Sequence, residues 1–139
     1  DNPRNSLEMF SDNIKYLGLD PLFGDTSYFR VIGMAEFLPI KSESFENVCF
    51  NTSLDHVLDY YKALQEAHRV LVDGGKLFIS TLIWKNDAEL YHDHVHFHHF
   101  KEYEIYGALN MLGFNLEKIQ VYPYRKDKHR VGMYLIAAK

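Results

Sequence analysis

The stretch from Asp59 to Leu82 constrains the fold more than any other part of this chain. Over residues 59–72, side chains that can face a core recur at the spacing of a helix. They are Tyr61, Leu64, Ala67, His68 and Leu71. Gly74 and Gly75 follow, where the end of a helix favours glycine. Lys76–Leu82 is then an almost continuous apolar run, typical of a strand covered on both faces.

The remaining patterns predict further strands and helices in alternation with this pair. Strands are expected at residues 15–19, 29–32, 45–50, 114–124 and 131–138, and helices at 5–14 and 101–112. The connection between the last two strands is short, so they are predicted to form an antiparallel hairpin. The sequence therefore predicts a single α/β domain over residues 1–139, with a mostly parallel sheet finished by that hairpin.

Composition excludes several classes of protein. Hydrophobic residues make up 47 % of the 139-residue chain, which is enough for a core, and the net charge of -4 provides no basic field for nucleic acid. One cysteine, Cys49, cannot form an internal disulfide, which fits a reducing compartment. No apolar run is long enough to span a bilayer. We expect a cytoplasmic protein without nucleic-acid or membrane partners.

Several ordered segments together carry a family resemblance. They are Glu36-Phe37-Leu38-Pro39, the strand 45–50, Leu54-Asp55-His56-Val57, Arg69-Val70-Leu71, Gly74-Gly75 and the strand from Lys76. In this order the chain resembles the class I methyltransferases that depend on S-adenosylmethionine, of the methyltransferase type 11 kind. The resemblance implies a Rossmann-like fold. It also implies transfer of a methyl group from S-adenosylmethionine to a small-molecule acceptor, which leaves S-adenosylhomocysteine.

The resemblance also implies which residues hold the cofactor. Ligands bind beyond the carboxyl ends of the strands in open parallel sheets. Asp20 lies at such an end, where its carboxylate would accept hydrogen bonds from the ribose; the alternative is that Asp20 only begins a turn with Pro21. Ala35 and Glu36 would border the adenine. The family often has aspartate where this chain has Met34, which weakens the adenine contact through that side chain.

The segment from Asn51 to His56 would lie near the methyl group that is transferred. Asn51 and Ser53 are expected on the cofactor side of it. His56 is the candidate catalytic base, because an imidazole titrates near neutral pH. The alternative is that His56 caps or packs beneath the following helix. Arg69 and the two glycines after it are assigned to structure, as a helix end and its stop.

The glycine-rich loop of the family is missing from this sequence. None of the 8 glycines forms a G-x-G pair. By resemblance the first strand and first helix are missing or incomplete, which leaves a gap between the Asp20 strand and the strand 45–50. A second chain, as in a homodimer, is one way to fill it. Losing two or three hydrogen bonds to the charged end of the cofactor, at about 1.5–3 kcal/mol each, predicts weak binding.

Five of the 8 histidines crowd the stretch between Tyr91 and Phe100. By resemblance this stretch covers the acceptor pocket, and His96, His98 or His99 would orient the acceptor. The alternative is a zinc or copper site, because alternate histidines of an extended chain point the same way. A zinc site usually draws ligands from two separate segments, however, and no CxxC or HExxH motif is present. The sequence therefore predicts no metal ligands.

Two other functions remain open. The missing glycine loop and Met34 would suit a non-catalytic module that kept the fold to bind a partner. A metal-dependent protein built on the histidine stretch is the third hypothesis. Neither the acceptor nor the methylated atom can be identified from the sequence.

Overall fold

The computed structural model describes residues 15–22, 30–85, 94–124 and 128–139. The chain divides into two compact units, residues 1–34 and residues 35–139. The helix expected at 5–14 lies outside the described residues. Each unit is considered by itself.

The first unit contains two short parallel strands. They are β1 (Gly18–Asp20) and β2 (Arg30–Ile32), in the register Gly18↔Arg30 and Asp20↔Ile32. The Gly33 N–H donates to the carbonyl oxygen of Asp20 at 3.1 Å, which continues the pairing by one bond. The strand predicted at 15–19 is present at residues 18–20, and the described residues 30–32 of the strand predicted at 29–32 are in β2.

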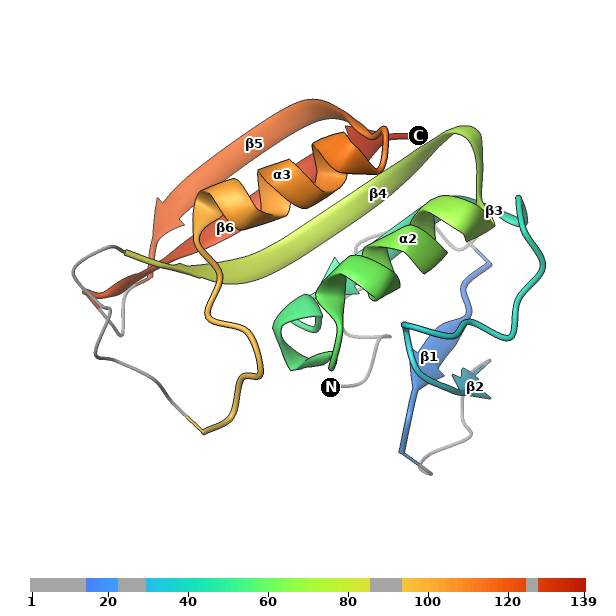
Figure 1. Cartoon of the computed structure of the whole chain (residues 1–139), viewed down its shortest axis with the longest axis horizontal. Coiled ribbons are helices and arrows are strands. Elements are labelled where there is room, and N and C mark those ends of the chain that lie inside the picture. The colour runs from blue at the N-terminus through green and yellow to red at the C-terminus, as the bar shows by residue number, and fades with distance from the viewer. Residues whose placement is uncertain (1–14, 23–29, 86–93, 125–127) are drawn as a thin grey trace. The chain divides into compact units, whose positions relative to one another are not determined.

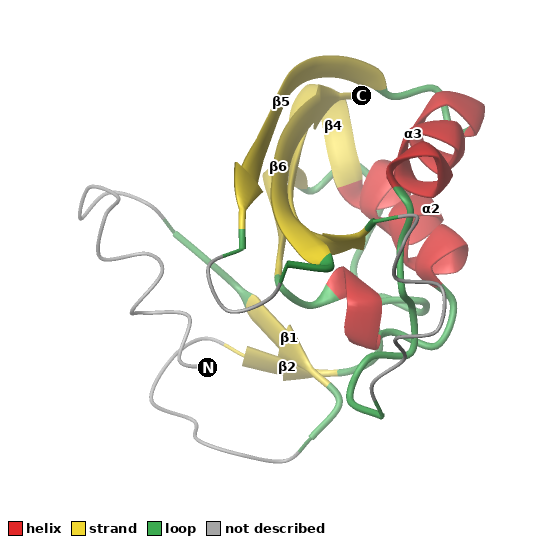
Figure 2. Ribbon diagram, turned by 90° about the vertical axis from the view of Figure 1, so that its left-hand side faces the viewer, coloured by secondary structure: helices red, strands yellow, loops and turns green. Residues whose placement is uncertain are grey.

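The second unit is a four-stranded sheet with helices on one face (Figures 1 and 2). Its strands lie in the order β3-β4-β6-β5. They are β3 (Phe45–Asn51), β4 (Leu71–Trp84), β5 (Asn115–Pro123) and β6 (Arg130–Ala138). β3 pairs parallel to β4, and β4–β6 and β6–β5 pair antiparallel. The predicted α/β class and C-terminal hairpin are confirmed. Within the described residues, one edge of β3 has no partner strand.

The helices α2 (Tyr60–Val70) and α3 (Glu102–Met111) lie side by side on this sheet (Figure 2). Asp59 begins α2 by accepting a hydrogen bond from the Lys62 N–H. From α2, Leu64 and Ala67 are fully buried as predicted, whereas the predicted Tyr61 and His68 are only half-buried. The fully buried Leu77 and Ile79 of β4 pack in the same core. Apolar burial on this face holds the layers together.

The structure corrects the predicted role of Gly74 and Gly75. The helix ends at Val70, earlier than expected, and β4 begins at the next residue. The two glycines lie inside β4, where the register with β3 shifts. Gly74 has a φ of +75°, and a Cβ on Gly75 would lie 2.8 Å from the carbonyl oxygen of Val72. The pair therefore makes a tight backbone irregularity in the strand and does not cap the helix.

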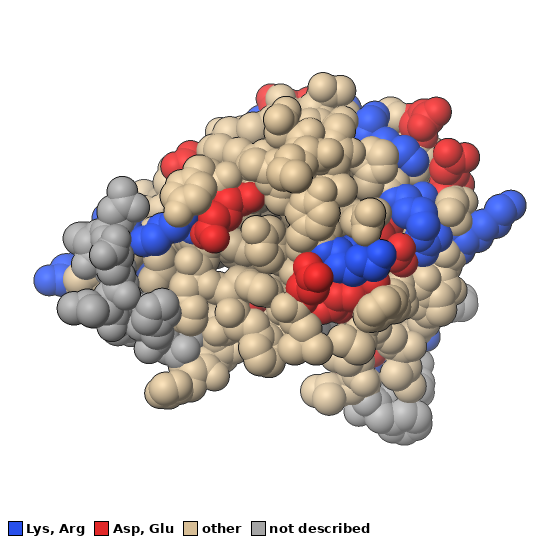
Figure 3. All heavy atoms as spheres, viewed as in Figure 1, with Lys and Arg blue, Asp and Glu red and all other residues tan. Residues whose placement is uncertain are grey.

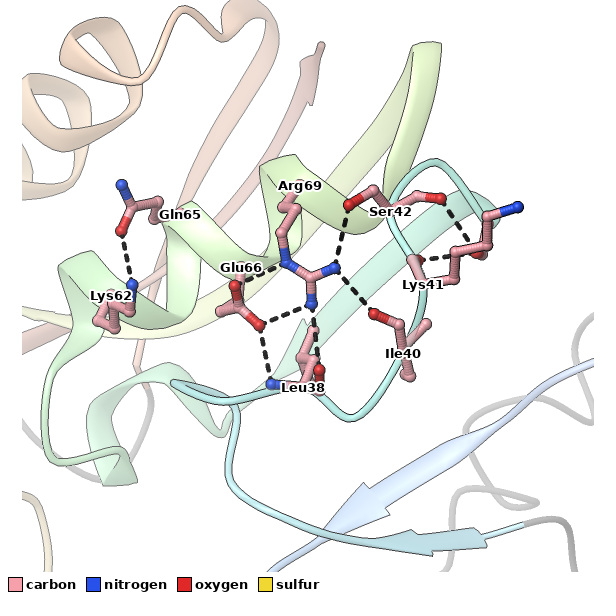
Figure 4. Close-up of polar contacts among 9 residues, drawn as sticks. Leu38, Ile40, Lys41, Ser42, Lys62, Gln65, Glu66 and Arg69 are labelled. Atoms are coloured by element: carbon pink, nitrogen blue, oxygen red, sulfur yellow. Dashed lines mark hydrogen bonds and ion pairs between the residues drawn. The ribbon is translucent and has the colours of Figure 1, made fainter.

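Arg69 fastens residues 38–42 to α2 (Figure 4). Its Nε donates to Oε1 of Glu66 and its Nη2 donates to Oε2, each at 2.8 Å. The same guanidinium donates to the carbonyl oxygens of Leu38 and Ile40 and to Ser42 Oγ. Glu66 in turn accepts from the Leu38 N–H at 2.9 Å. The structural assignment of Arg69 is confirmed, and its fork of donors explains why arginine suits this position.

Figure 3 shows the charged side chains on one face of the molecule. On the face seen in Figure 3, the described Lys and Arg side chains lie in small groups mixed with Asp and Glu. In the part of the chain that the structure describes, no helix is long and apolar enough to cross a membrane.

The glycine correction predicts opposite effects at two positions. Gly75→Ala should lower the free energy of unfolding by about 1–3 kcal/mol, because the new Cβ meets backbone oxygen. Gly107→Ala, within α3 and with no atom within 4 Å of the new Cβ, should raise it by about 1 kcal/mol. Urea denaturation followed by circular dichroism measures both. Equal effects would contradict the assignment of Gly75 to a crowded turn.

Loss of the Glu66 charge should give a stability difference that depends on pH. The hydrogen bond from Arg69 holds the pKa of Glu66 below its ordinary value of 4.5. Glu66→Gln should therefore cost about 1–3 kcal/mol at pH 7. Since a lowered carboxyl pKa stabilises the folded state above the unfolded pKa, this difference should vanish as pH falls through the folded pKa.

The matched control is Glu117→Gln, which removes a carboxylate from an exposed ion pair with Lys76. It should change stability by less than about 1 kcal/mol, because exposed pairs contribute little. Denaturation between pH 3 and 7 compares the two variants.

Candidate functional site

The candidate site is built on the short helix η1 (Leu54–His56), directly after β3. Thr52 takes a left-handed φ of 51° and donates its N–H to the carbonyl oxygen of Ser80 at 2.8 Å. Leu54 is fully buried in the core and anchors the turn. Asp55 and His56 are thereby held at the carboxyl end of β3.

Residues 94–100, the lid segment, are fastened onto η1. The N–H groups of Phe97 and His98 both donate to the carbonyl oxygen of Asp55, at 2.9 and 3.1 Å. Phe100 is buried in the core, and its carbonyl oxygen accepts from the Trp84 N–H at 2.9 Å. Two segments that are about forty residues apart in sequence therefore meet at a defined register.

Three polar side chains gather where η1 meets the lid segment, and we call them the Asp55 cluster: Asp55, His56 and His96. Their potential ligand atoms all lie within 4.8 Å of one another. Asp55 is 2 % exposed, and its Oδ2 lies 3.5 Å from Nε2 of His96. The rings of His56 and His96 stack with centroids 4.8 Å apart. The cluster is thus one buried carboxylate beneath two imidazoles.

The hydrogen bonding of His56 determines which nitrogen carries its proton. Nδ1 of His56 lies 3.1 Å from the carbonyl oxygen of Val95. A carbonyl oxygen can only accept, so Nδ1 is the donor, and in the neutral ring Nε2 keeps its lone pair. His56 is exposed. In the neutral ring, Nε2 of this exposed side chain therefore carries no proton.

The other lid histidines lie in different surroundings. His99 packs against the edge of Trp84, with centroids 4.8 Å apart, and Trp84 also contacts His96 at 5.5 Å. His98 stacks on Phe100 and contacts Tyr60 of α2 edge-on. Among the three predicted lid residues, only His96 joins the Asp55 cluster.

Among the described histidines of the stretch, only His96 belongs to a group that could hold a metal ion. His94 is exposed and is not in the cluster. His92 and Asp93 lie outside the described residues.

Glu36 has a structural role that the sequence did not reveal. Its side chain is buried, and Oε1 accepts from the N–H groups of Leu58 and Asp59, at 2.7 and 3.1 Å. These amides precede α2, so the carboxylate holds the entry to that helix. Its contact with adenine stays a prediction.

The remaining predicted residues of the second unit lie around β3 and η1. Ala35 is half-buried against the core. Asn51 is the last residue of β3 and is exposed. Ser53 immediately precedes η1, is half-buried and makes no capping hydrogen bond to it. Nothing in these contacts tests the cofactor role of the three residues.

In the first unit, the turn predicted as the alternative for Asp20 is present. Oδ1 of Asp20 accepts from the Leu22 N–H at 2.8 Å, and Oδ2 lies 3.1 Å from Nη2 of Arg30. The side chain is 44 % exposed. Since each carboxylate oxygen can accept a second hydrogen bond, this turn is compatible with ribose binding.

Asp55 and Trp84 were not predicted from the sequence as residues of the candidate site. Asp55 was visible as the neighbour of His56, in the segment that carried the resemblance. Nothing in the sequence indicated that Trp84 would contact His96 and His99, because that contact needs the lid segment to return to the end of β4.

Comparison with known families tests the family resemblance carried by the segments between Glu36 and Ser80. A family model described as "Methyltransferase domain" matches residues 6–79, more than half of the chain. The chain belongs to this family. The class I methyltransferase fold expected from the resemblance is confirmed by this match and by similar solved structures.

One curated relative is the human "Ubiquinone biosynthesis O-methyltransferase, mitochondrial", which is 30 % identical over 80 residues. The match covers 55 % of this chain, and it spans only 22 % of that relative's length.

Two solved structures show how widely the fold is shared. A SAM-dependent methyltransferase from Methanosarcina mazei has a TM-score of 0.68 at 20 % identity, over 81 % of this chain and 68 % of its own. The [4+2]-cyclase SpnF has a TM-score of 0.70 at 14 % identity, over 81 % of this chain and 57 % of its own. At these identities the likeness establishes the fold alone.

The role found for Glu36 can be tested by stability. Glu36→Ala removes the acceptor of two partly buried backbone N–H groups and should cost about 1–3 kcal/mol. Glu36→Gln keeps an acceptor oxygen and should cost less than half of that. Glu46→Ala, an exposed glutamate of β3, is the control and should be within about 0.5 kcal/mol of the parent. Equal stability of all three variants would show that Glu36 does not stabilise the start of α2.

Proposed function

We propose that this methyltransferase domain transfers the methyl group of S-adenosylmethionine to a hydroxyl oxygen of a small molecule. The observation that carries the proposal is the Asp55 cluster, where His56 has a basic Nε2 at the carboxyl end of β3. Ligands of open α/β sheets bind at this end of the strands. The printed name of the curated relative, an O-methyltransferase, supports a hydroxyl acceptor.

The chemistry requires alignment more than it requires acid or base strength. The cofactor supplies an activated methyl group on a sulfonium; the S–C bond breaks as the O–C bond forms, and S-adenosylhomocysteine remains. A hydroxyl acceptor must also lose its proton, so a nearby base accelerates the step. His56 is suited to that role, because its ring is oriented by Val95 and its other nitrogen keeps a lone pair. The lid segment, with His96, His98 and His99, would cover the acceptor.

The family relationship supports our assignment of residues on the cofactor side. Asp20 would accept hydrogen bonds from the ribose hydroxyls with the oxygen lone pairs left after its bonds to Leu22 and Arg30. Ala35 and Glu36 would border the adenine, and Asn51 and Ser53 would lie near the methionine part. A cytoplasmic location and a homodimer stay predictions from the sequence.

Activity is tested on protein expressed from its complete coding sequence. The protein is incubated with cofactor labelled in its methyl group and with a set of small phenols and alcohols. Labelled product should form together with S-adenosylhomocysteine. If the protein neither binds cofactor nor forms product, the non-catalytic partner-binding module is the better interpretation.

Loss of the Asp20 carboxylate should weaken cofactor binding. Asp20→Asn can still accept from the Leu22 N–H but loses the charge, so affinity for S-adenosylmethionine should fall about 10- to 100-fold. Isothermal titration calorimetry measures it. Asp73→Asn, at an exposed position of β4, is the control and should bind like the parent. Unchanged affinity in Asp20→Asn would remove Asp20 from the cofactor site.

A further inference from the structure

The geometry points to a site for a divalent transition-metal cation of the zinc class, held by Asp55, His56 and His96. Two imidazoles and one carboxylate are ligands that zinc accepts, and three protein ligands leave a fourth position open. Binding of the metal does not depend on the function proposed above. Its use in activating an acceptor does rest on that proposal.

The first argument is the spacing between Asp55 and His96. Oδ2 of Asp55 and Nε2 of His96 are 3.5 Å apart. That is longer than a good hydrogen bond between nitrogen and oxygen, for which about 2.7–3.2 Å is usual. It matches the separation of about 3.4 Å that two ligands adopt around tetrahedral zinc, whose bonds are near 2.1 Å. The pair is therefore spaced for a shared cation better than for a direct hydrogen bond.

The second argument is the burial of Asp55. Its side chain is 2 % exposed, and Oδ1 has no hydrogen-bond partner among the residues that the structure describes. A buried carboxylate is costly unless a cation or several hydrogen bonds compensate its charge. A divalent cation bound to the carboxylate would supply that compensation.

The third argument is the orientation of His56. Histidines that bind metals usually donate their other ring N–H to a carbonyl or carboxylate, which fixes the ring and its tautomer. The Nδ1–H of His56 makes this bond to Val95 at 3.1 Å. The arrangement leaves Nε2 of His56, on an exposed side chain, as the nitrogen that can bind an ion.

The cluster also satisfies a requirement that the histidine stretch alone did not meet. Its ligands come from two segments, η1 and the lid segment, as is usual for zinc sites. The two N–H bonds from Phe97 and His98 to the backbone of Asp55 hold these segments in register. The ligand atoms lie within 4.8 Å of one another, whereas two ligands of one zinc ion are at most about 4.2 Å apart, so side-chain rotation within this supported frame would complete the site.

The open fourth position indicates how the site would act. A bound cation polarises an oxygen that coordinates to it and lowers the pKa of its proton. A hydroxyl acceptor at that position would lose its proton to solvent and attack the methyl carbon as an alkoxide or phenoxide. Under this inference the lone pair on Nε2 of His56 binds the cation, so His56 activates the acceptor as a metal ligand in place of acting as the base.

The test is metal binding by protein purified without a histidine tag and stripped with a chelator. Calorimetric titration with ZnCl₂ should give one ion per chain. CoCl₂ should give the visible absorption of a four-coordinate ion. Asp55→Asn, His56→Ala and His96→Ala should each weaken zinc binding by about 10- to 100-fold or more. His94→Ala, an exposed histidine of the same stretch, is the matched control and should bind like the parent.

Circular dichroism checks that each variant is folded. If an alanine variant does not fold, Asp55→Asn, which preserves the shape of the side chain, still tests the site. Absence of stoichiometric binding by the parent overturns the inference, as does zinc affinity that survives all three substitutions or is lost with His94→Ala. Titration without S-adenosylmethionine keeps this result separate from the proposed methyl transfer. A protein that binds cofactor and no zinc would lose the metal site and keep the methyltransferase function.

Discussion

The pairing of β4 on both of its edges is the constraint on which the second unit depends. β3 pairs parallel along one edge and β6 antiparallel along the other, so the backbone of β4 is paired on both sides over Lys76–Ser80. Its inward side chains, including the fully buried Leu77 and Ile79, provide the surface on which α2 and α3 pack. An apolar strand in this position is stable because its polar groups are bonded and its side chains are covered.

The same strand also positions the candidate site. Ser80 of β4 accepts from Thr52, which turns the chain from β3 into η1. At the end of β4, the backbone N–H of Trp84 donates to the carbonyl oxygen of Phe100, and the Trp84 ring contacts His96. The Asp55 cluster therefore lies between two attachments to one strand. Side chains fixed by such a scaffold can hold a ligand with little loss of conformational entropy.

The fold by itself leaves the chemistry open. A SAM-dependent methyltransferase and the cyclase SpnF share this architecture at low identity with the chain. Function must therefore be argued from the site. Here the distinctive feature is a buried carboxylate beneath two histidines, one of which is oriented by a backbone carbonyl. That arrangement suits activation of a protonated acceptor, which methyl transfer to oxygen requires.

The sequence by itself determined the elements whose signals are local. The helical spacing before Val70, the apolar run after Lys76 and the short connection before the last strand predicted α2, β4 and the hairpin. The ordered segments from Glu36 to Ser80 were sufficient for the family. These signals can be read from the sequence because periodicity and turn chemistry act within a few residues.

Only the tertiary structure decided which polar residues meet. Gly74 and Gly75 lie inside β4 and not at a helix end. Glu36 accepts hydrogen bonds from the backbone amides that precede α2. The tertiary structure also selected His96 from the histidine stretch and placed it beside Asp55, about forty residues away in sequence. Such pairings depend on the path of the whole chain through the core, so the local pattern of residues could not predict them.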